Sequence, residues 1–307
     1  VRSRGLGDVY KRQMNGCAKK RFENYKQQPL EFVFDKSFTG KLSQFGLNPD
    51  RRTPSGIKAA IIREKGTNGE REMAYMLYLA GFDVKDVTMT DLVSGRETLE
   101  DINMIVFCGG FSNSDVLGSA KGWAGTFLFN PKAKAALDNF YARQDTLSLG
   151  VCNGCQLMME LGLITPEDKK KGKMLHNDSH KFESAFLGVT VPMNRSVMFG
   201  SLSGSKLGIW VAHGEGKFSL PYPEDHYNVV LKYSYDEYPG NPNGSDYSVA
   251  GIASQDGRHL AMMPHLERAC FPWNNAFYPA DRVNEDQITP WMEAFVNARK
   301  WVEAHKK

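Results

Sequence analysis

The chain has 307 residues, of which 41% are hydrophobic and 24% are charged, as in globular proteins that bury a sizeable core. No apolar run approaches the ~20 residues that cross a bilayer, and no secretory signal segment is evident, so we expect a cytoplasmic protein that binds no membrane. The number of cysteines is odd, which favours free thiols over a disulfide framework. The cysteines are Cys17, Cys108, Cys152, Cys155 and Cys270.

The formal net charge of +3 comes from the first thirteen residues, which carry four basic side chains and one acidic one. The rest of the chain has 34 of each sign, so the charge balance does not indicate nucleic-acid binding. Residues 3–13 resemble a translated sequencing-library adapter. We therefore expect residues 1–13 to be a non-native tail on a protein truncated at its N-terminal side. A natural, basic and disordered tail is the alternative.

Residues 14–55 are polar, with isolated aromatic residues and three prolines. This composition predicts a linker, or the tail of a missing region, and not a segment that folds by itself. Regular patterns begin after it. We therefore predict one domain over residues 56–307.

The first part of this domain alternates short apolar strands with helical patterns. Near-continuous apolar strands of this kind favour a parallel sheet that is covered by helices on both faces. The predicted fold class is therefore α/β, with an open and mostly parallel sheet flanked by helices. The predicted strands are residues 58–62, 82–87, 104–108 and 147–151, and the predicted helices are residues 70–80, 132–143 and 155–161, with a turn at 66–69.

The second part of the domain is rich in predicted strands, and turn signals separate them. Ligands of open α/β sheets bind beyond the carboxyl ends of the strands, and both Gly109-Gly110 and Cys152 follow such ends. The predicted strands of this C-terminal half are residues 186–192, 208–213, 229–235, 249–254 and 259–263, and a closing helix is predicted at 290–304.

Cys152 lies at the centre of a Gly-x-Cys-x-Gly sequence, between a predicted strand and a predicted helix. This is the layout of a nucleophile elbow, in which Gly150 and Gly154 let backbone pack where a Cβ would clash. The N-terminus of the following helix favours the thiolate. We predict that Cys152 is a catalytic nucleophile, and a buried structural cysteine is the alternative.

Cys155 forms a Cys-x-x-Cys pair with Cys152, which would also suit a redox couple or half of a zinc site. The chain has no second pair at metal-ligand spacing, and no thioredoxin-like pattern surrounds the first. We therefore expect no metal site and interpret Cys155 as a core residue of the elbow helix. A thiol redox or metal-binding module stays as one alternative function.

His265 and Glu267 follow the apolar strand predicted at residues 259–263. In an extended segment, residues i and i+2 face the same side, so the carboxylate can orient the ring. Together with Cys152 they would form a nucleophile, a base and an orienting group. His213 is the strongest competitor, because glycines and an acid follow it, and we expect it to line the pocket. The other competing histidines are His176, His180 and His259.

An acyl-transfer intermediate carries an oxyanion that needs two aimed N–H donors. Gly109 and Gly110, at a strand end, can supply one donor, and the amide of Asn153 can supply the other. Gln156 lies one helical turn past the nucleophile and could point its amide at the substrate. An ordinary Gly-Gly turn and an exposed helix position are the alternatives for these residues.

Several of these segments occur in the same order in one known family. From about Ile57 to the C-terminus, the chain resembles the C-terminal glutaminase domain of the phosphoribosylformylglycinamidine synthases, which are class I (triad-type) glutamine amidotransferases with a flavodoxin-like sheet. Leu266 stands where that family usually has proline, which loosens a stiff turn and keeps both catalytic groups. The segments that carry the resemblance are residues 149–156, 108–112, 114–118, 213–216, 241–245 and 262–268, together with Asn68 and residues 70–74.

The resemblance implies that Cys152 attacks the side-chain carboxamide of glutamine, and that His265, held by Glu267, protonates the departing ammonia. It also implies that the ammonia passes inside the protein to a synthetase domain of the same polypeptide, where ATP and Mg²⁺ activate formylglycinamide ribonucleotide in purine biosynthesis. No Gly-Lys-Ser/Thr phosphate loop occurs in the chain, so we expect no cofactor in it. A γ-glutamyl peptidase-like cysteine hydrolase of similar fold is the other alternative function, and glutamine dependence would discriminate between them.

Overall fold

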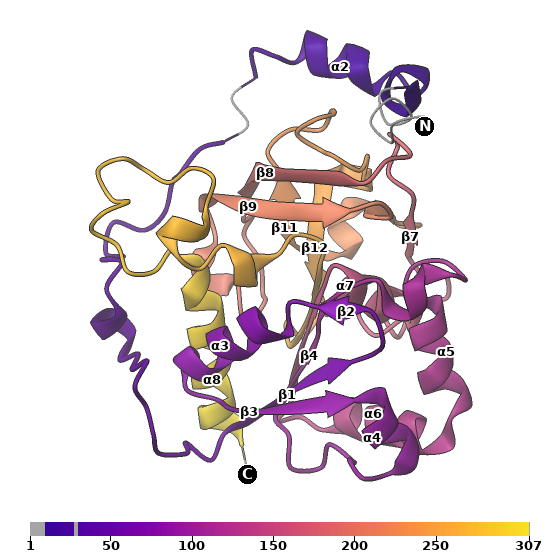
Figure 1. Ribbon diagram of the computed structural model, residues 1–307, viewed down its shortest axis with the longest axis vertical. Coiled ribbons are helices and arrows are strands. Elements are labelled where there is room, and N and C mark those ends of the chain that lie inside the picture. The colour runs from indigo at the N-terminus through magenta and orange to yellow at the C-terminus, as the bar shows by residue number, and fades with distance from the viewer. Residues whose placement is uncertain (1–9, 28–29, 307) are drawn as a thin grey trace, which may run out of the picture.

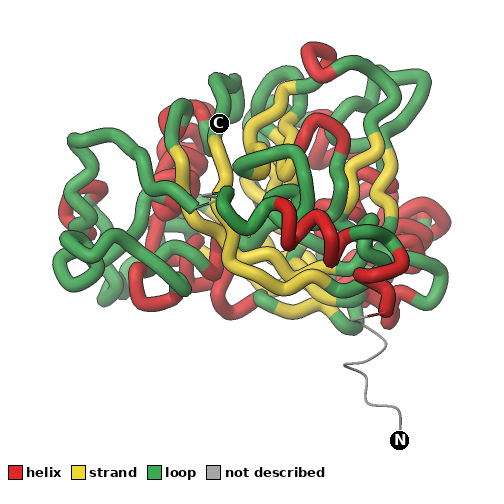
Figure 2. The backbone as a smooth tube through the Cα atoms, turned by 90° about the horizontal axis from the view of Figure 1, so that it is seen from above, coloured by secondary structure: helices red, strands yellow, loops and turns green. Residues whose placement is uncertain are grey.

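A nine-stranded sheet lies at the centre of the molecule in the computed structural model, which describes residues 10–27 and 30–306. Figure 2 shows the strands in the middle, with helices on either side. The strands of this sheet are β1 (Lys58–Arg63), β3 (Asp83–Thr88), β4 (Met104–Phe107), β6 (Leu147–Val151), β8 (Glu183–Thr190), β9 (Lys206–His213), β11 (Asn228–Tyr233), β12 (Val249–Ala253) and β13 (His259–Met262).

The strand order across the sheet is β3-β1-β4-β6-β13-β12-β11-β8-β9. The first five strands run parallel, and the remaining four continue the sheet by antiparallel pairing. Every residue of β4 and β6 is buried, as the uninterrupted apolar sequence predicts for strands covered on both faces. The predicted α/β class is confirmed. Of the strands in the C-terminal half, β8, β9, β11 and β12 form the antiparallel extension of the sheet, while β13 joins the parallel part.

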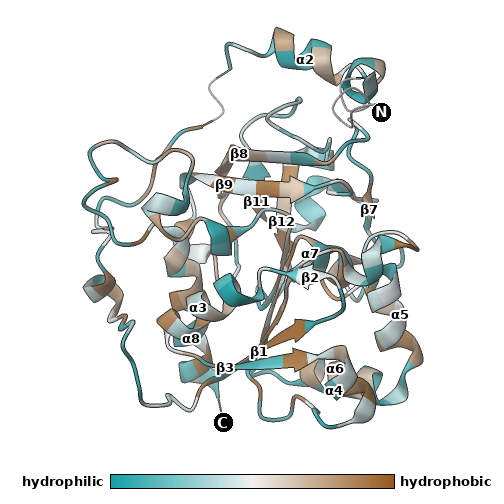
Figure 3. Ribbon diagram, in the orientation of Figure 1, coloured by the Kyte–Doolittle hydropathy of each residue, from teal (hydrophilic) through white to brown (hydrophobic). Residues whose placement is uncertain are grey.

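Helices cover both faces of the parallel part of the sheet (Figure 1). Helices α3 (Glu70–Ala80) and α8 (Trp291–His305) contact each other on one face, while α5 (Lys121–Phe129) contacts α6 (Pro131–Ala142) and α7 (Asn153–Glu160) on the other. The short helix α4 (Met89–Ser94) packs against α6. Figure 3 shows the hydrophobic colour concentrated on the strands, where the core lies. Within residues 10–27 and 30–306, no helix has the length and apolar character needed to span a membrane.

One predicted turn, and several segments for which no strand is predicted, form short strands. The predicted turn at residues 66–69 contains β2 (Thr67–Asn68), which pairs antiparallel with β5 (Gly109–Gly110). A second small sheet joins β7 (Lys173–Leu175) to β10 (Lys217–Ser219). Backbone pairing with a distant partner creates these strands, and no local sequence pattern predicts it.

The N-terminal segment lies along the surface of the domain. Helix α2 (Cys17–Glu23) is followed by a chain that pairs with β9 through a bridge between Val33 and Lys206. Phe38 is buried against the core, and the Arg51 guanidinium lies 2.9 Å from the Asp83 carboxylate. Residues 1–9 of the expected adapter tail lie outside the described residues.

Candidate active site

Cys152 occupies a sharp turn between β6 and α7, as the elbow pattern predicts. Its backbone angles are φ 53° and ψ −107°, an uncommon conformation for a residue that has a Cβ. The flanking glycines make the turn possible. A Cβ on Gly154 would lie 2.0 Å from the carbonyl oxygen of Phe107, and a Cβ on Gly150 would lie 2.5 Å from the carbonyl oxygen of Gly154. Strain of this kind is typical of functional sites.

The close approach at Gly154 predicts a large loss of stability when a methyl group is added there. We expect Gly154→Ala to lower the free energy of unfolding by about 3 kcal/mol or more, because neither the helix nor β4 can move away without disturbing the core. Urea denaturation measures this change. Gly200→Ala is the matched control: a Cβ there meets nothing within 4 Å, so its effect should stay within about 1 kcal/mol. Equal effects of the two substitutions would contradict the packing argument.

His265 and Glu267 follow β13, the parallel neighbour of β6 in the sheet. The Nδ1 atom of His265 lies 2.7 Å from Oε1 of Glu267, and each side chain is only 2% exposed. The backbone N–H of Cys152 donates to the Met262 carbonyl at 2.9 Å. Gly109 packs beside both catalytic candidates, because a Cβ there would lie 2.8 Å from Cε1 of His265 and 3.3 Å from the Cβ of Cys152. The fold thus brings the three predicted triad residues together.

The charge state of His265 is set by its neighbours. Burial lowers the pKa of the ring, but the Glu267 charge and the hydrogen bonds with Cys152 and Glu267 outweigh it, and the pKa rises to about 9. At neutral pH the ring is therefore protonated in the free site. A buried imidazolium between a carboxylate and a thiol is the arrangement that supports a thiolate nucleophile.

A cavity of about 90 Å³ opens beside the nucleophile. Its wall contains four of the residues predicted from the sequence, namely Gly110, Cys152, Gln156 and His213. Gly110 belongs to the strand β5 and has a φ of 115°, and Asn153 is the first residue of α7. The two backbone segments predicted to hold an oxyanion therefore border the thiol from different elements.

Residues 56–302 match the family described as the CobB/CobQ-like glutamine amidotransferase domain. The chain belongs to this family. It is 45% identical over 266 residues to the Arabidopsis thaliana protein named "Probable phosphoribosylformylglycinamidine synthase, chloroplastic/mitochondrial". The match covers 80% of this chain and 19% of that protein. It is 44% identical over 280 residues to the Homo sapiens phosphoribosylformylglycinamidine synthase, and this match covers 81% of this chain and 21% of that protein.

Structural similarity points to the same group. The structure of PurLQS from Thermotoga maritima matches with a TM-score of 0.57 and 27% sequence identity, over 82% of this chain and 99% of that chain. The chain spans about one fifth of the length of the curated relatives it matches. The amidotransferase fold inferred from the sequence motifs is confirmed.

Gln156 takes part in the wall of the amidotransferase cavity and is only 5% exposed. Its Nε2 donates to the Glu215 carbonyl at 2.8 Å, and its Oε1 accepts from Nδ2 of Asn153 at 2.9 Å. Asn153 in turn accepts from the Ser112 N–H at 3.1 Å. The alternative of an exposed helix position is wrong for Gln156, and a direct contact with substrate stays a prediction.

His213 ends β9 and is 2% exposed, with neither ring nitrogen hydrogen-bonded within the described part of the chain. Burial, together with the charge of His265, lowers the pKa of His213 to about 3, so this ring is neutral and lines the cavity without an orienting carboxylate. His259 is bonded instead to the Ser148 hydroxyl at 2.9 Å. Of the histidines considered, only His265 forms a hydrogen bond with a carboxylate within the described residues, whereas Nδ1 of His176 lies 3.8 Å from Oε1 of Glu215.

The other residues that line the cavity have no role predicted from the sequence. They are Phe111, Asp115, Ser119, Phe182, Ala212, Gly214 and Glu215. Asp115 and Glu215 stand inside two of the segments that carry the family resemblance, residues 114–118 and 213–216. Those segments were a signal that could have identified them.

The remaining thiols differ from Cys152 in their surroundings. Cys155 is fully buried on α7, and burial raises its pKa well above the ordinary value, as it does for Cys108 and Cys270. Within residues 10–27 and 30–306, no group of three or more histidine, cysteine, aspartate or glutamate side chains could hold a metal ion. Burial keeps these three thiols neutral and poorly nucleophilic.

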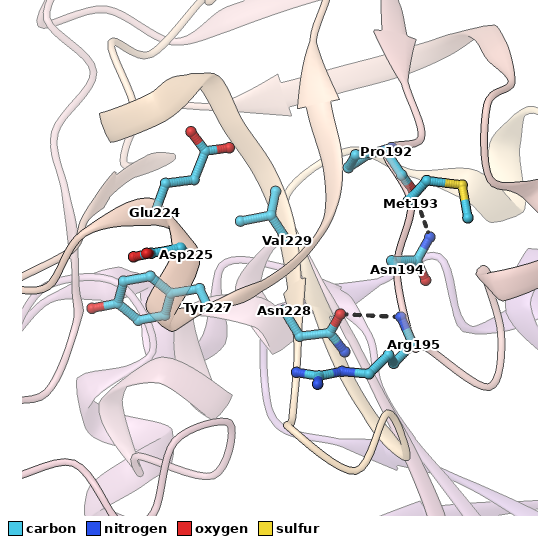
Figure 4. A pocket seen from close by; sticks show the side chains of 9 residues that line it. All are labelled: Pro192, Met193, Asn194, Arg195, Glu224, Asp225, Tyr227, Asn228 and Val229. Carbon is cyan, nitrogen blue, oxygen red and sulfur yellow. Dashed lines mark hydrogen bonds between the residues drawn. The ribbon is translucent and has the colours of Figure 1, made fainter.

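A wider surface depression of the amidotransferase domain, about 640 Å³, lies elsewhere, between residues 192–195 and residues 224–229. Figure 4 shows its lining side chains, with Oδ1 of Asn228 accepting from the Arg195 N–H at 3.2 Å and Nδ2 of Asn194 donating to the Pro192 carbonyl at 2.9 Å. Its described lining residues include no cysteine or histidine, so it offers no nucleophile and base, and we assign the chemistry to the smaller cavity.

Proposed function

We propose that this chain is the glutaminase domain of a phosphoribosylformylglycinamidine synthase, and that it hydrolyses L-glutamine to glutamate and ammonia. The observation that carries the proposal is the strained, buried Cys152 beside the 2.7 Å pair of His265 and Glu267. The names of the relatives support the same assignment.

In the proposed reaction, the Cys152 sulfur attacks the side-chain carboxamide carbon of glutamine. Backbone N–H groups near Gly110 and Asn153 stabilise the oxyanion that forms. The protonated ring of His265 gives its proton to the leaving nitrogen, and ammonia departs as the γ-glutamyl thioester forms. His265 then takes a proton from water, which attacks the thioester. The C–S bond breaks, glutamate is released, and the Cys152 thiolate is restored beside the protonated ring.

In the proposed synthase, the ammonia is used by another part of the polypeptide. We propose that it passes to a synthetase domain of the same polypeptide, where ATP and Mg²⁺ serve the conversion of formylglycinamide ribonucleotide to formylglycinamidine ribonucleotide. We propose a cytoplasmic location, whereas the name of the Arabidopsis relative places that protein in chloroplasts or mitochondria.

Labelling by a glutamine-mimicking diazoketone, followed by mass spectrometry, tests the proposed glutaminase. We expect a single modification on Cys152 that L-glutamine prevents and that Cys152→Ala abolishes. Labelling on Cys155 would overturn the assignment of the nucleophile. Absence of labelling both in this chain and in the full-length enzyme would overturn the proposed function.

A further inference from the structure

Two carboxylates share the small cavity that contains the nucleophile. Asp115 ends the 3₁₀ turn at Ser112–Asp115, and Glu215 follows β9. Both line the cavity together with Cys152. Glu215 also lines the wider depression of about 480 Å³ that adjoins the cavity. Glu215 therefore borders both the cavity of the nucleophile and the wider depression, and Asp115 borders the cavity.

Neither carboxylate pairs with a lysine or arginine in the part of the chain that the structure describes. Oδ1 of Asp115 accepts from Nδ2 of Asn153 at a long 3.4 Å, and Oδ2 accepts from the Ser119 hydroxyl at 3.5 Å. Oε2 of Glu215 accepts from the Ser119 N–H at 3.3 Å, and its other oxygen lies 3.8 Å from Nδ1 of His176. Within the described residues, no lysine or arginine forms an ion pair with either acid.

This arrangement of two carboxylates is electrostatically unfavourable. Burial and the nearby charge of Glu215 both raise the pKa of Asp115, because two like charges are held together in a poorly solvated place. A cation bound between the carboxylates would relieve both effects. The cavity wall itself supplies no such cation, so the ligand has to bring it.

A separate observation shows that the cavity is built for a polar ligand. His213 is 2% exposed and lines the same cavity, yet both of its ring nitrogens lack a hydrogen-bond partner in the described part of the chain. A buried polar group without a partner costs free energy that native structures rarely accept without a functional reason. The neutral ring also contributes no positive charge that could balance the two acids.

We propose that Asp115 and Glu215 bind the α-ammonium group of L-glutamine and thereby select an amino-acid amide over other amides. This inference rests on the proposed glutaminase function. In glutamine the carboxamide and the α-ammonium group are separated by two methylene groups and the α-carbon, so a substrate held at Cys152 by one end presents its ammonium group farther along the same cavity. Two carboxylates at that position would provide charge-assisted hydrogen bonds.

The test compares L-glutamine with glutaramate, which is the same molecule without the α-amino group. The wild-type chain should prefer L-glutamine. We expect Asp115→Asn and Glu215→Gln each to lower kcat/KM for L-glutamine by roughly 10- to 100-fold, mainly through KM, while kcat/KM for glutaramate changes by less than about threefold. Matched controls are Asp138→Asn and Glu303→Gln, because both acids are exposed on helices outside the cavity and should leave both substrates unaffected.

The outcomes separate this inference from the proposed function. Equal losses on both substrates would show a structural role and overturn the inference, as would unchanged kinetics or a wild-type chain without preference for L-glutamine. If turnover is too slow to measure, rates of Cys152 labelling by the diazoketone and by its des-amino counterpart give the same comparison. A wild-type protein that neither hydrolyses glutamine nor becomes labelled would instead overturn the proposed function.

Discussion

Replacing Cys152 with alanine is expected to lower kcat for glutamine hydrolysis by roughly 10⁴-fold or more, because removal of the nucleophile ends thioester formation. The elbow places this thiol on the wall of the cavity, which no other described cysteine lines. Release of ammonia and of glutamate, followed in parallel, measures the loss.

Cys155→Ala is the matched control for this prediction. Cys155 lies on α7 one turn past the nucleophile, and its side chain is fully buried. Its replacement should change kcat by less than about fivefold, because the smaller side chain costs some packing free energy and removes no reacting group. An active Cys152→Ala variant, or an inactive Cys155→Ala variant with a normal unfolding transition, would contradict the assignment.

Helix α3 shows which elements the sequence predicts well. Its predicted range, residues 70–80, equals the observed Glu70–Ala80, because Gly69 and Gly81 flank it and both take a left-handed φ, at 81° and 104°. Apolar strands such as β4 and β6 are likewise found within one residue of their predicted ends. Strong local signals at both ends of an element fix its position.

Helix α5 shows why other elements escape sequence reasoning. Gly122 and Gly125 lower the helix propensity of this segment, so no helix is predicted there. Tertiary packing overrides that preference, since Trp123 and Phe127 are buried with their rings 5.8 and 6.0 Å from that of Phe107. Burial of two large aromatic side chains outweighs the cost of two glycines.

In the candidate site, too, some features follow from local sequence signals and others depend on tertiary structure. Local motifs predict Cys152, His265 and Glu267 as a reacting group, but their proximity depends on the pairing of β6 with β13, strands that are distant in the sequence. The position of Asp115 depends on three successive residues with left-handed φ, at 51°, 56° and 51° for Asn113, Ser114 and Asp115. Residues other than glycine seldom adopt that conformation, so no propensity rule predicts which side chain such a turn directs into the cavity.

Glu267→Gln is expected to lower kcat for glutamine hydrolysis by roughly 10²- to 10⁴-fold, because an amide neither stabilises the imidazolium nor fixes its tautomer as a carboxylate does. The carboxylate has few other partners. Its Oε2 has no hydrogen-bond partner in the described part of the chain, and its Oε1 lies 3.6 Å from the Arg268 guanidinium. Steady-state kinetics between pH 6 and pH 9 measure the loss.

The same substitution should change how stability depends on pH. In the wild-type protein the pKa of His265 is raised from 6.5 to about 9. Protonation of His265 therefore contributes stability that is fully present below about pH 6.5 and is lost as the pH rises through about 9. Glu267→Gln removes the charge that contributes most to raising this pKa, and leaves burial, which lowers it, opposed only by the interactions with Cys152. The variant should accordingly lose this dependence. The difference in unfolding free energy between wild type and variant should therefore shrink by roughly 1–3 kcal/mol between pH 6.5 and pH 9.

Glu97→Gln provides the matched control, since Glu97 is also a buried glutamate and pairs with Lys85 far along the sheet from the site. It should leave kcat and the stability change between pH 6.5 and pH 9 as in wild type, even if the protein is less stable at every pH. A Glu267→Gln variant with wild-type kcat would refute the orienting role. A variant with reduced kcat whose unfolding free energy keeps the wild-type slope over this range would show that the Glu267 charge does not hold the proton on His265.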